Sequence, residues 1–143
     1  MPAADLPERE RLPRWREELA RGIVRVDMEP LGSHLPFHAE ATVLALPGVR
    51  TVTCTGSAAR STRTRAMAAE SDDSIGLVVN LGPKAAVSQR GREMTLETGD
   101  AFLIRTDEMA VLTSTHHLGI LLTRAALAAR VRDLDGAMMR VIP

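Results

Sequence analysis

Turn signals interrupt this sequence at short intervals between residues 23 and 123. Glycine, proline and clustered polar residues recur, as in Leu46-Pro47-Gly48 and Thr98-Gly99-Asp100, and short apolar runs lie between them. Many short strands at a spacing of roughly 8–12 residues are typical of a β-sandwich or β-barrel. We therefore predict a mainly β fold with strands over residues 23–28, 37–46, 49–56, 62–69, 75–81, 85–89, 93–97, 101–105, 109–114 and 116–122.

A helix is predicted before the strands. Pro13 suits a first helical position, and Gly22 can end the helix. Trp15 and Leu19 stand four positions apart, so they share one helix face. We assign residues 1–22 to an N-terminal helical segment and residues 23–123 to the β domain.

Helical spacing returns in residues 124–143. Thr123 can act as the N-cap of a helix over about 124–134, and Gly136 can act as its C-cap. The apolar stripe of this helix consists of Leu127, Val131 and Leu134. The stripe predicts either a dimer interface or a helix that covers the β domain. The apolar run 137–143 stops where another element would begin, so we expect a larger protein that continues past Pro143.

The composition excludes several classes of function. The chain has 143 residues, enough for one domain, and 18 basic and 18 acidic side chains give a net charge of zero. The strongly basic field of a non-specific nucleic-acid binder is therefore missing. Aromatic residues make up only 2%, too few for a platform that stacks single-stranded bases.

Cys54 is the only cysteine in the sequence. An intramolecular disulfide is therefore impossible, and a reducing environment is expected. No signal peptide and no run of 18 apolar residues is present, so we predict a cytoplasmic protein with no membrane partner. Cys54 lies in an alternating strand pattern without a helix N-terminus to activate it, and we interpret it as a small core or pocket residue.

Four histidines raise the alternative of a stand-alone metal-dependent enzyme. His34, His38 and Glu40, with His116 as a further ligand, offer the imidazole and carboxylate groups that zinc, iron or manganese accept. The spacing is poor, because His38 and Glu40 share a strand face whereas His34 precedes the strand in a turn. The competing interpretation is a set of polar residues on a solvated face.

Other catalytic and phosphate-binding patterns are missing. The sequence has no Gly-x-Ser-x-Gly nucleophile motif and no glycine-rich phosphate loop. One local charge asymmetry stands out, because no acidic residue occurs between positions 49 and 69. The basic residues there are Arg50, Arg60, Arg63 and Arg65. These arginines either attract an anionic ligand or lie on a solvated strand face.

Three segments in a fixed order carry a family resemblance. An apolar strand at 77–82 is followed by a Gln89-Arg90-Gly91-Arg92-Glu93 hairpin and then by a Gly99-Asp100 turn that leads into the apolar run 101–104. Arg63-Thr64 upstream and the strand-to-helix passage 121–127 fit the same pattern. Over roughly residues 30–136, the chain resembles the N-terminal regulatory domain of AraC-type transcription regulators.

The resemblance implies a cupin-like antiparallel β-barrel followed by helices. Members of the family hold a small effector in the barrel and often dimerise through the helices. They bind DNA through a carboxy-terminal domain of two helix-turn-helix motifs, which this sequence lacks. The histidine motifs of metal-dependent cupins are also missing after Gly32 and after Gly99-Asp100. We therefore predict no enzymatic activity, no cofactor and no resident metal.

The expected ligand is a small organic effector inside the barrel. Arg63 and Met67 are assigned to one face of a strand, and an arginine there favours an aromatic or aliphatic acid. The predicted ligand-binding residues are Arg63, Met67, Val79, Gln89, His116 and Leu118. The predicted partner is a second copy of the chain, bound through Leu127, Val131 and Leu134. DNA is expected to bind only through the absent domain.

Overall fold

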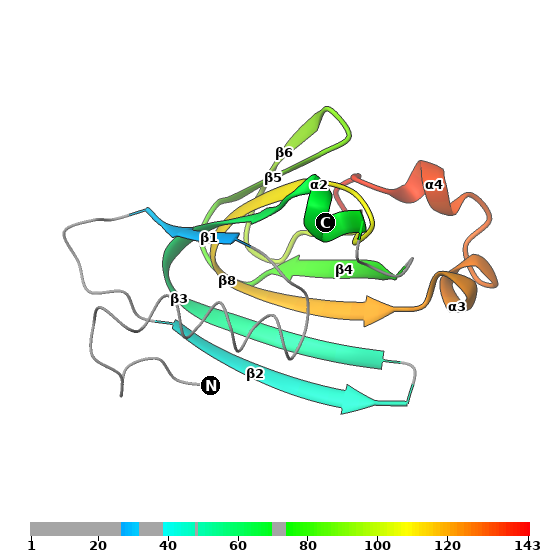
Figure 1. Ribbon diagram of the computed structural model, residues 1–143, viewed down its shortest axis with the longest axis horizontal. Coiled ribbons are helices and arrows are strands. Elements are labelled where there is room, and N and C mark those ends of the chain that lie inside the picture. The colour runs from blue at the N-terminus through cyan, green and yellow to red at the C-terminus, as the bar shows by residue number, and fades with distance from the viewer. Residues whose placement is uncertain (1–26, 32–38, 48, 70–73) are drawn as a thin grey trace.

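An eight-stranded antiparallel sheet forms most of the computed structural model, which describes residues 27–31, 39–47, 49–69 and 74–143 (Figure 1). The strands are β1 (Asp27–Pro30), β2 (Ala39–Leu46), β3 (Val49–Arg63), β4 (Ile75–Asn80), β5 (Ala85–Gln89), β6 (Arg92–Leu96), β7 (Ala101–Arg105) and β8 (Ala110–Leu122). The helices are α2 (Arg65–Ala69), α3 (Arg124–Ala128) and α4 (Leu134–Ala137). This confirms the predicted mainly β, cupin-like fold with helices after the sheet. The predicted N-terminal helix lies outside the described residues.

The two longest strands, β3 and β8, pair at the centre of the sheet. Their register runs from Val49 opposite Leu122 to Arg63 opposite Ala110. β4 and then β7 follow on the far side of β8, whereas β2 and β1 pair with successive halves of β3. β5 pairs with the first half of β8 and with β6. Figure 1 shows β3 and β8 bending strongly, so that the halves of each strand belong to opposite layers.

An irregularity in the β3–β8 ladder accompanies this bend. The register shifts between Thr55 and Ala59, next to Gly56, whose φ of 150° is typical of glycine. Sequence reasoning placed a break between strands at this position and another near residue 115. Both expectations were wrong. Glycine and serine at 56–57 form a bulge inside the continuous strand β3 rather than a turn, and residue 115 lies inside the continuous strand β8.

Two further elements differ from the prediction. Residues 65–69 form α2 instead of the end of a strand, because their alanine-rich sequence favours a helix and the Thr64 hydroxyl accepts a hydrogen bond from the Met67 N–H (3.3 Å). The single helix predicted over 124–134 is two short helices. Asp133 caps a new helix through its Oδ1, which accepts from the Gly136 N–H (3.0 Å), so Gly136 lies inside α4 rather than after it.

The predicted local signals elsewhere are confirmed. Thr123 is the N-cap of α3, and its hydroxyl accepts from the Ala126 N–H (3.2 Å). Arg90 and Gly91 both have positive φ, 56° and 74°, in the two-residue turn between β5 and β6. Gly99 has a φ of 92° at the next corner. None of the helices that the structure describes is long and apolar enough to cross a membrane.

Strand β7 separates two apolar clusters, because its successive side chains point to opposite faces. Phe102 and Ile104 belong to the inner cluster, which contains Val87 and Leu96. Leu103 belongs to the outer cluster, where C-terminal residues cover the sheet. The outer cluster consists of Ile75, Leu103, Leu134 and Met138, with Leu77, Leu127, Val131 and Ala137 packed against it.

The C-terminal segment also pairs with the edge of β7. The Met139 N–H donates to the Leu103 carbonyl (2.9 Å), and Ala101 and Ile142 exchange two backbone hydrogen bonds (2.8 and 2.7 Å). A bare strand edge promotes pairing with other chains. The segment 138–142 therefore protects this edge and holds α4 against the outer face.

Candidate functional site

A cavity of about 160 Å³ lies between the layers of the curved sheet. In the β3–β8 ladder, Cys54 is opposite His117 and Val52 is opposite Gly119, and residues opposite each other project from the same face. All four line the cavity, and Phe102 of β7 lines it as well. The wall is therefore built from strands that are far apart in the sequence.

The irregularity in β3 brings further polar groups to the same cavity. Cys54 faces inward before it, and Ser61 and Arg63 face inward after it. The inward positions of β3 change from even to odd residue numbers across the bulge. Those of β8 change from odd, at His117, to even, at Leu112.

Two glycines keep part of the cavity open. A Cβ atom at Gly76 would lie 3.1 Å from Cγ2 of Ile104, and one at Gly119 would lie 3.2 Å from Cγ1 of Val52. Both distances are tighter than ordinary van der Waals contact. The missing side chains therefore contribute to the space enclosed by the sheet.

Arg63 supplies positive charge at the cavity wall. Its side chain is buried, with 8% of its surface exposed, and its Nε–H donates to the Thr106 carbonyl at 2.6 Å. The Thr106 hydroxyl in turn donates to the Ser74 carbonyl (2.9 Å). These contacts fix the guanidinium beside the loop that joins β7 to β8.

His117 is another ionisable group of the cavity. Desolvation lowers its pKa to about 4, with a smaller contribution from the nearby His116. The neutral ring shares a hydrogen bond between Nδ1 and the Ser114 hydroxyl (2.9 Å), the only one that it makes to a described residue. A neutral imidazole can donate or accept a hydrogen bond with a ligand.

Cys54 lines the cavity as an unreactive thiol. Burial raises its pKa to about 11, so the thiolate is not populated near neutral pH. This confirms the interpretation of Cys54 as a small core or pocket residue.

The structure brings only one of the six predicted ligand-binding residues to this cavity, namely Arg63. Met67 is buried on α2, so it does not share a strand face with Arg63. Val79 and Leu118 are opposite each other on the outer face. His116 also takes the alternate position to His117, away from the cavity.

Gln89 is buried and has a structural role. Its Nε2–H donates to the Arg105 carbonyl (2.8 Å), and its Oε1 accepts from the Arg105 N–H (3.0 Å). Sequence reasoning missed Val52, Val78, Phe102, Leu112 and His117. Strand alternation predicts that either His116 or His117 faces the cavity. Choosing between them requires the position of the bulge, which determines which residues face inward.

The three predicted dimer residues lie against the sheet. Leu134 is buried in the outer cluster, and Leu127 and Val131 pack against it. They cover β4 and β7, which is the second of the two roles that the stripe predicts.

The predicted metal ligands are not brought together among the described residues. His34 and His38 lie outside them, Glu40 is on the exposed β2, and His116 is on the outer side of β8. Within the described ranges, no group of three or more histidine, cysteine, aspartate or glutamate side chains could hold a metal ion.

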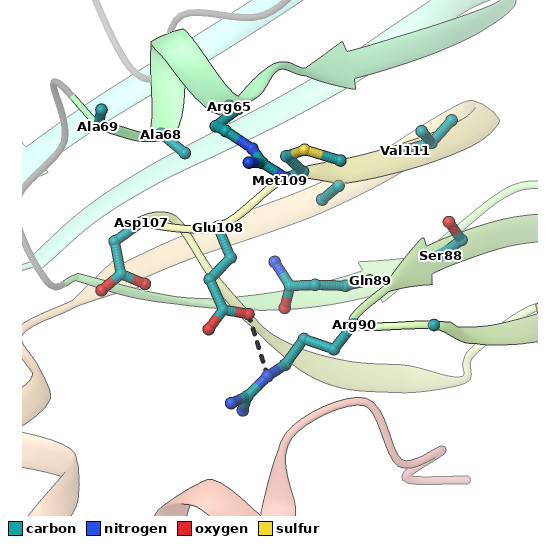
Figure 2. Close-up of a pocket in the computed structure, with 12 residues that line it drawn as sticks. Arg65, Ala68, Ala69, Ser88, Gln89, Arg90, Asp107, Glu108, Met109 and Val111 are labelled. Carbon is teal, nitrogen blue, oxygen red and sulfur yellow. Dashed lines mark ion pairs between the residues drawn. The ribbon is translucent and has the colours of Figure 1, made fainter.

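A second, larger recess of about 530 Å³ opens on the surface between α2, the β5–β6 turn and the loop before β8 (Figure 2). Figure 2 shows Arg65 reaching from α2 toward Met109, with Arg90 and Glu108 on the other side. The Arg90 Nε and the Glu108 Oε2 form an ion pair at 3.1 Å. We call this recess the surface groove.

An ion-pair network connects the surface groove with the C-terminal helices. Arg105 forms two hydrogen bonds of 2.9 Å to Asp107 and lies 3.6 Å from Glu108. It also lies 3.7 Å from Asp135 of α4, which pairs with Arg124 of α3 at 2.7 Å. The hydrogen bonds with Arg105 lower the pKa of Asp107, so this carboxylate stays ionised.

Comparison with known protein families identifies the chain. Residues 15–143 match a family described as AraC-binding-like domain, which spans most of the sequence. The chain belongs to this family. This confirms the resemblance to the N-terminal regulatory domain of AraC-type regulators that was predicted over roughly residues 30–136.

A solved structure shows the same fold as this AraC-binding-like domain. The AraC-like transcriptional activator CuxR has a TM-score of 0.79 at 21% identity, over 97% of this chain and 52% of CuxR. This chain thus spans about half the length of CuxR. A cupin protein from Bacteroides fragilis has a TM-score of 0.47 at 14% identity, over 73% of this chain and 89% of that protein. No curated protein matches the sequence.

Proposed function

We propose that this chain is the effector-binding domain of an AraC-type transcription regulator and is not an enzyme. The interior cavity supports this proposal, because it joins apolar walls to the cationic side chain of Arg63 and the neutral hydrogen-bonding side chain of His117. Membership of the AraC-binding-like family supports a regulatory role for the domain that holds the cavity, and the fold shared with CuxR is consistent with it. Effector binding would shift the equilibrium between arrangements of the DNA-binding domains in the full-length regulator.

The size and charge of the cavity favour a small aromatic or short aliphatic acid. Its volume is about 160 Å³. An apolar cavity of roughly 150 Å³ can hold a molecule the size of benzene. The carboxylate of such an acid would be attracted to Arg63, and its apolar body would contact Val78, Phe102 and Leu112.

Calorimetric titration with benzoate tests the effector site. We expect saturable binding to the unaltered chain and loss of binding in Cys54→Leu, because the larger side chain fills the cavity. Thr53→Leu is the matched control, because Thr53 is the neighbouring residue on the opposite face of β3. Equal benzoate affinity in both variants would exclude the interior cavity as the site.

We also propose that the full-length regulator is a homodimer. The packing of Leu127, Val131 and Leu134 on the sheet favours an interface elsewhere on the domain. Light scattering of Leu127→Glu with Val131→Glu separates the roles. We expect this variant to unfold, because Leu127 and Val131 help to cover the sheet. A folded monomer would instead show that the stripe Leu127, Val131 and Leu134 forms the dimer interface.

A further inference from the structure

The surface groove is separate from the interior cavity. Ala110 is the only described residue that lines both. The groove, at about 530 Å³, is also more than three times larger. Ligand sites commonly have volumes of roughly 300–1,000 Å³, so the groove can take a larger molecule than the interior cavity.

Among the described residues that line the groove, one charge is not neutralised, and it is positive. Its two carboxylates are already engaged, Asp107 with Arg105 and Glu108 with both Arg90 and Arg105. Arg65 makes no hydrogen bond or ion pair to any residue that the structure describes. Figure 2 shows its guanidinium directed into the groove beside Met109, on the side away from Arg90. An anionic group entering at Arg65 would therefore meet a cation that no carboxylate of the described lining already neutralises.

The base of the groove beside Arg65 is apolar. Met109 has 51% of its surface exposed, and Ala68, Ala110 and Val111 line the groove next to it. A long methionine side chain adapts its shape to a flexible apolar partner. The described lining contains no aromatic ring, so stacking of a base or sugar is not favoured. These features suit a linear hydrocarbon chain that ends in an acid.

We propose that the surface groove is a second binding site, for an amphiphilic organic anion such as a medium-chain carboxylate. The Arg65 guanidinium binds the carboxylate by charge-assisted hydrogen bonds, and Met109 and Val111 contact the chain. This site is independent of the effector proposed for the interior cavity. Its position beside the Arg90–Glu108–Arg105–Asp135 ion pairs places an anion next to the network that holds α4.

Methionine-methyl NMR of the whole 143-residue chain, titrated with decanoate, tests the site. Met109 is in the groove, none of the methionines whose side chains the structure describes lines the interior cavity, and the buried Met138 and Met139 serve as internal references. We expect a saturable shift of the Met109 methyl signal, which Met109→Leu assigns. Arg65→Gln should weaken decanoate binding roughly tenfold or more, the effect of removing a hydrogen bond to a charged group.

Three controls make the result decisive. Arg60→Gln removes another exposed arginine, on β3, and should leave the decanoate affinity unchanged. Decyltrimethylammonium has a ten-carbon hydrocarbon chain like that of decanoate but a positive headgroup, and it should not shift the Met109 methyl signal. Cys54→Leu fills the interior cavity and should preserve the decanoate shift. Equal affinity in Arg65→Gln, an unmoved Met109 signal, or loss of the shift in Cys54→Leu would each overturn the proposal.

Discussion

The two margins of the sheet differ in how their apolar side chains meet water. At the β4–β7 margin, Ile75 and Phe102 are completely buried. At the β2 margin, Val43 and Leu44 are 46% and 53% exposed, although the strand is no less apolar. The difference lies in the cover, because Leu134 and Met138 pack on Ile75 at the outer face, and Val87, Leu96 and Met139 pack on Phe102 at the inner face. Burial in this sheet is therefore set by the layer above each strand rather than by the strand's own hydrophobicity.

Truncation of Phe102 should show the largest contrast between the margins. Phe102→Ala leaves a cavity in the inner cluster, and we expect a loss of about 3–5 kcal/mol in the free energy of unfolding. Val43→Ala at the β2 margin should cost less than about 1 kcal/mol, because that side chain is already half in water. Urea denaturation measures both values. Similar losses would mean that β2 is covered in solution.

Truncation of Leu134 tests whether α4 is part of the covered margin. Leu134→Ala should cost about 2–4 kcal/mol, since Leu134 is buried against Ile75 and Leu103. Leu44→Ala, a chemically identical change on β2, should cost roughly 0.5 kcal/mol or less. A small loss for Leu134→Ala would show that α4 detaches from the sheet in solution.

Acid titration distinguishes the two faces of β8 through its adjacent histidines. The pKa of His117 in the folded state, about 4, lies below its ordinary value of 6.5, so the unfolded chain binds more protons between these values. Stability should be full above pH 6.5 and fall as the pH drops toward 4, by at most about 3 kcal/mol. His117→Gln should flatten this slope, whereas His116→Gln should keep most of it. Denaturation midpoints at several pH values give the slopes, and an unchanged slope in His117→Gln would assign the acid sensitivity to other groups.

Removal of one buried amide should give a smaller loss at the covered margin. The Asn80 side chain donates to the carbonyls of Pro83 (2.9 Å) and Glu97 (3.2 Å), and its Oδ1 accepts from the Gly82 N–H (3.3 Å). Asn80→Ala removes these hydrogen bonds. The Gly82 N–H keeps the His116 carbonyl as a partner and the Glu97 carbonyl keeps the Asp100 N–H, and we expect a loss of about 1–3 kcal/mol. Thr42→Ala on the exposed β2 is the matched polar control and should be nearly neutral. Thermal unfolding of the two variants makes the comparison.

Local signals in the sequence were sufficient for most of the sheet. The turn at Arg90-Gly91, the corner at Gly99 and the cap at Thr123 each act through neighbouring residues, and each was predicted correctly. The bulge beside Gly56 was not, because glycine followed by serine is equally compatible with a turn between strands. Whether such a site bends one strand or separates two is decided by pairing with β8, which is distant in the sequence.

The candidate site was harder to predict than the fold, and for the same reason. Alternation along β8 assigns His116 and His117 to opposite faces, but only the register with β3 identifies His117 as the inward residue. Arg63 was predicted because an arginine on an inward strand face can bind the carboxylate of an acid. Arg65 and Met109 both line the surface groove in a structure where residues 65–69 form a helix. Because the sequence predicted a strand over 62–69, this pairing could not be predicted.

The pairing of β3 with β8 also determines how this domain folds. The two strands at the centre of the sheet are separated in sequence by four other strands and a helix, so they pair only by closing a long loop. Chains dominated by such distant contacts fold slowly compared with chains of local hairpins. The local β5–β6 hairpin can form early, whereas the inner wall of the interior cavity is complete only when β8 has been synthesised and has paired with β3.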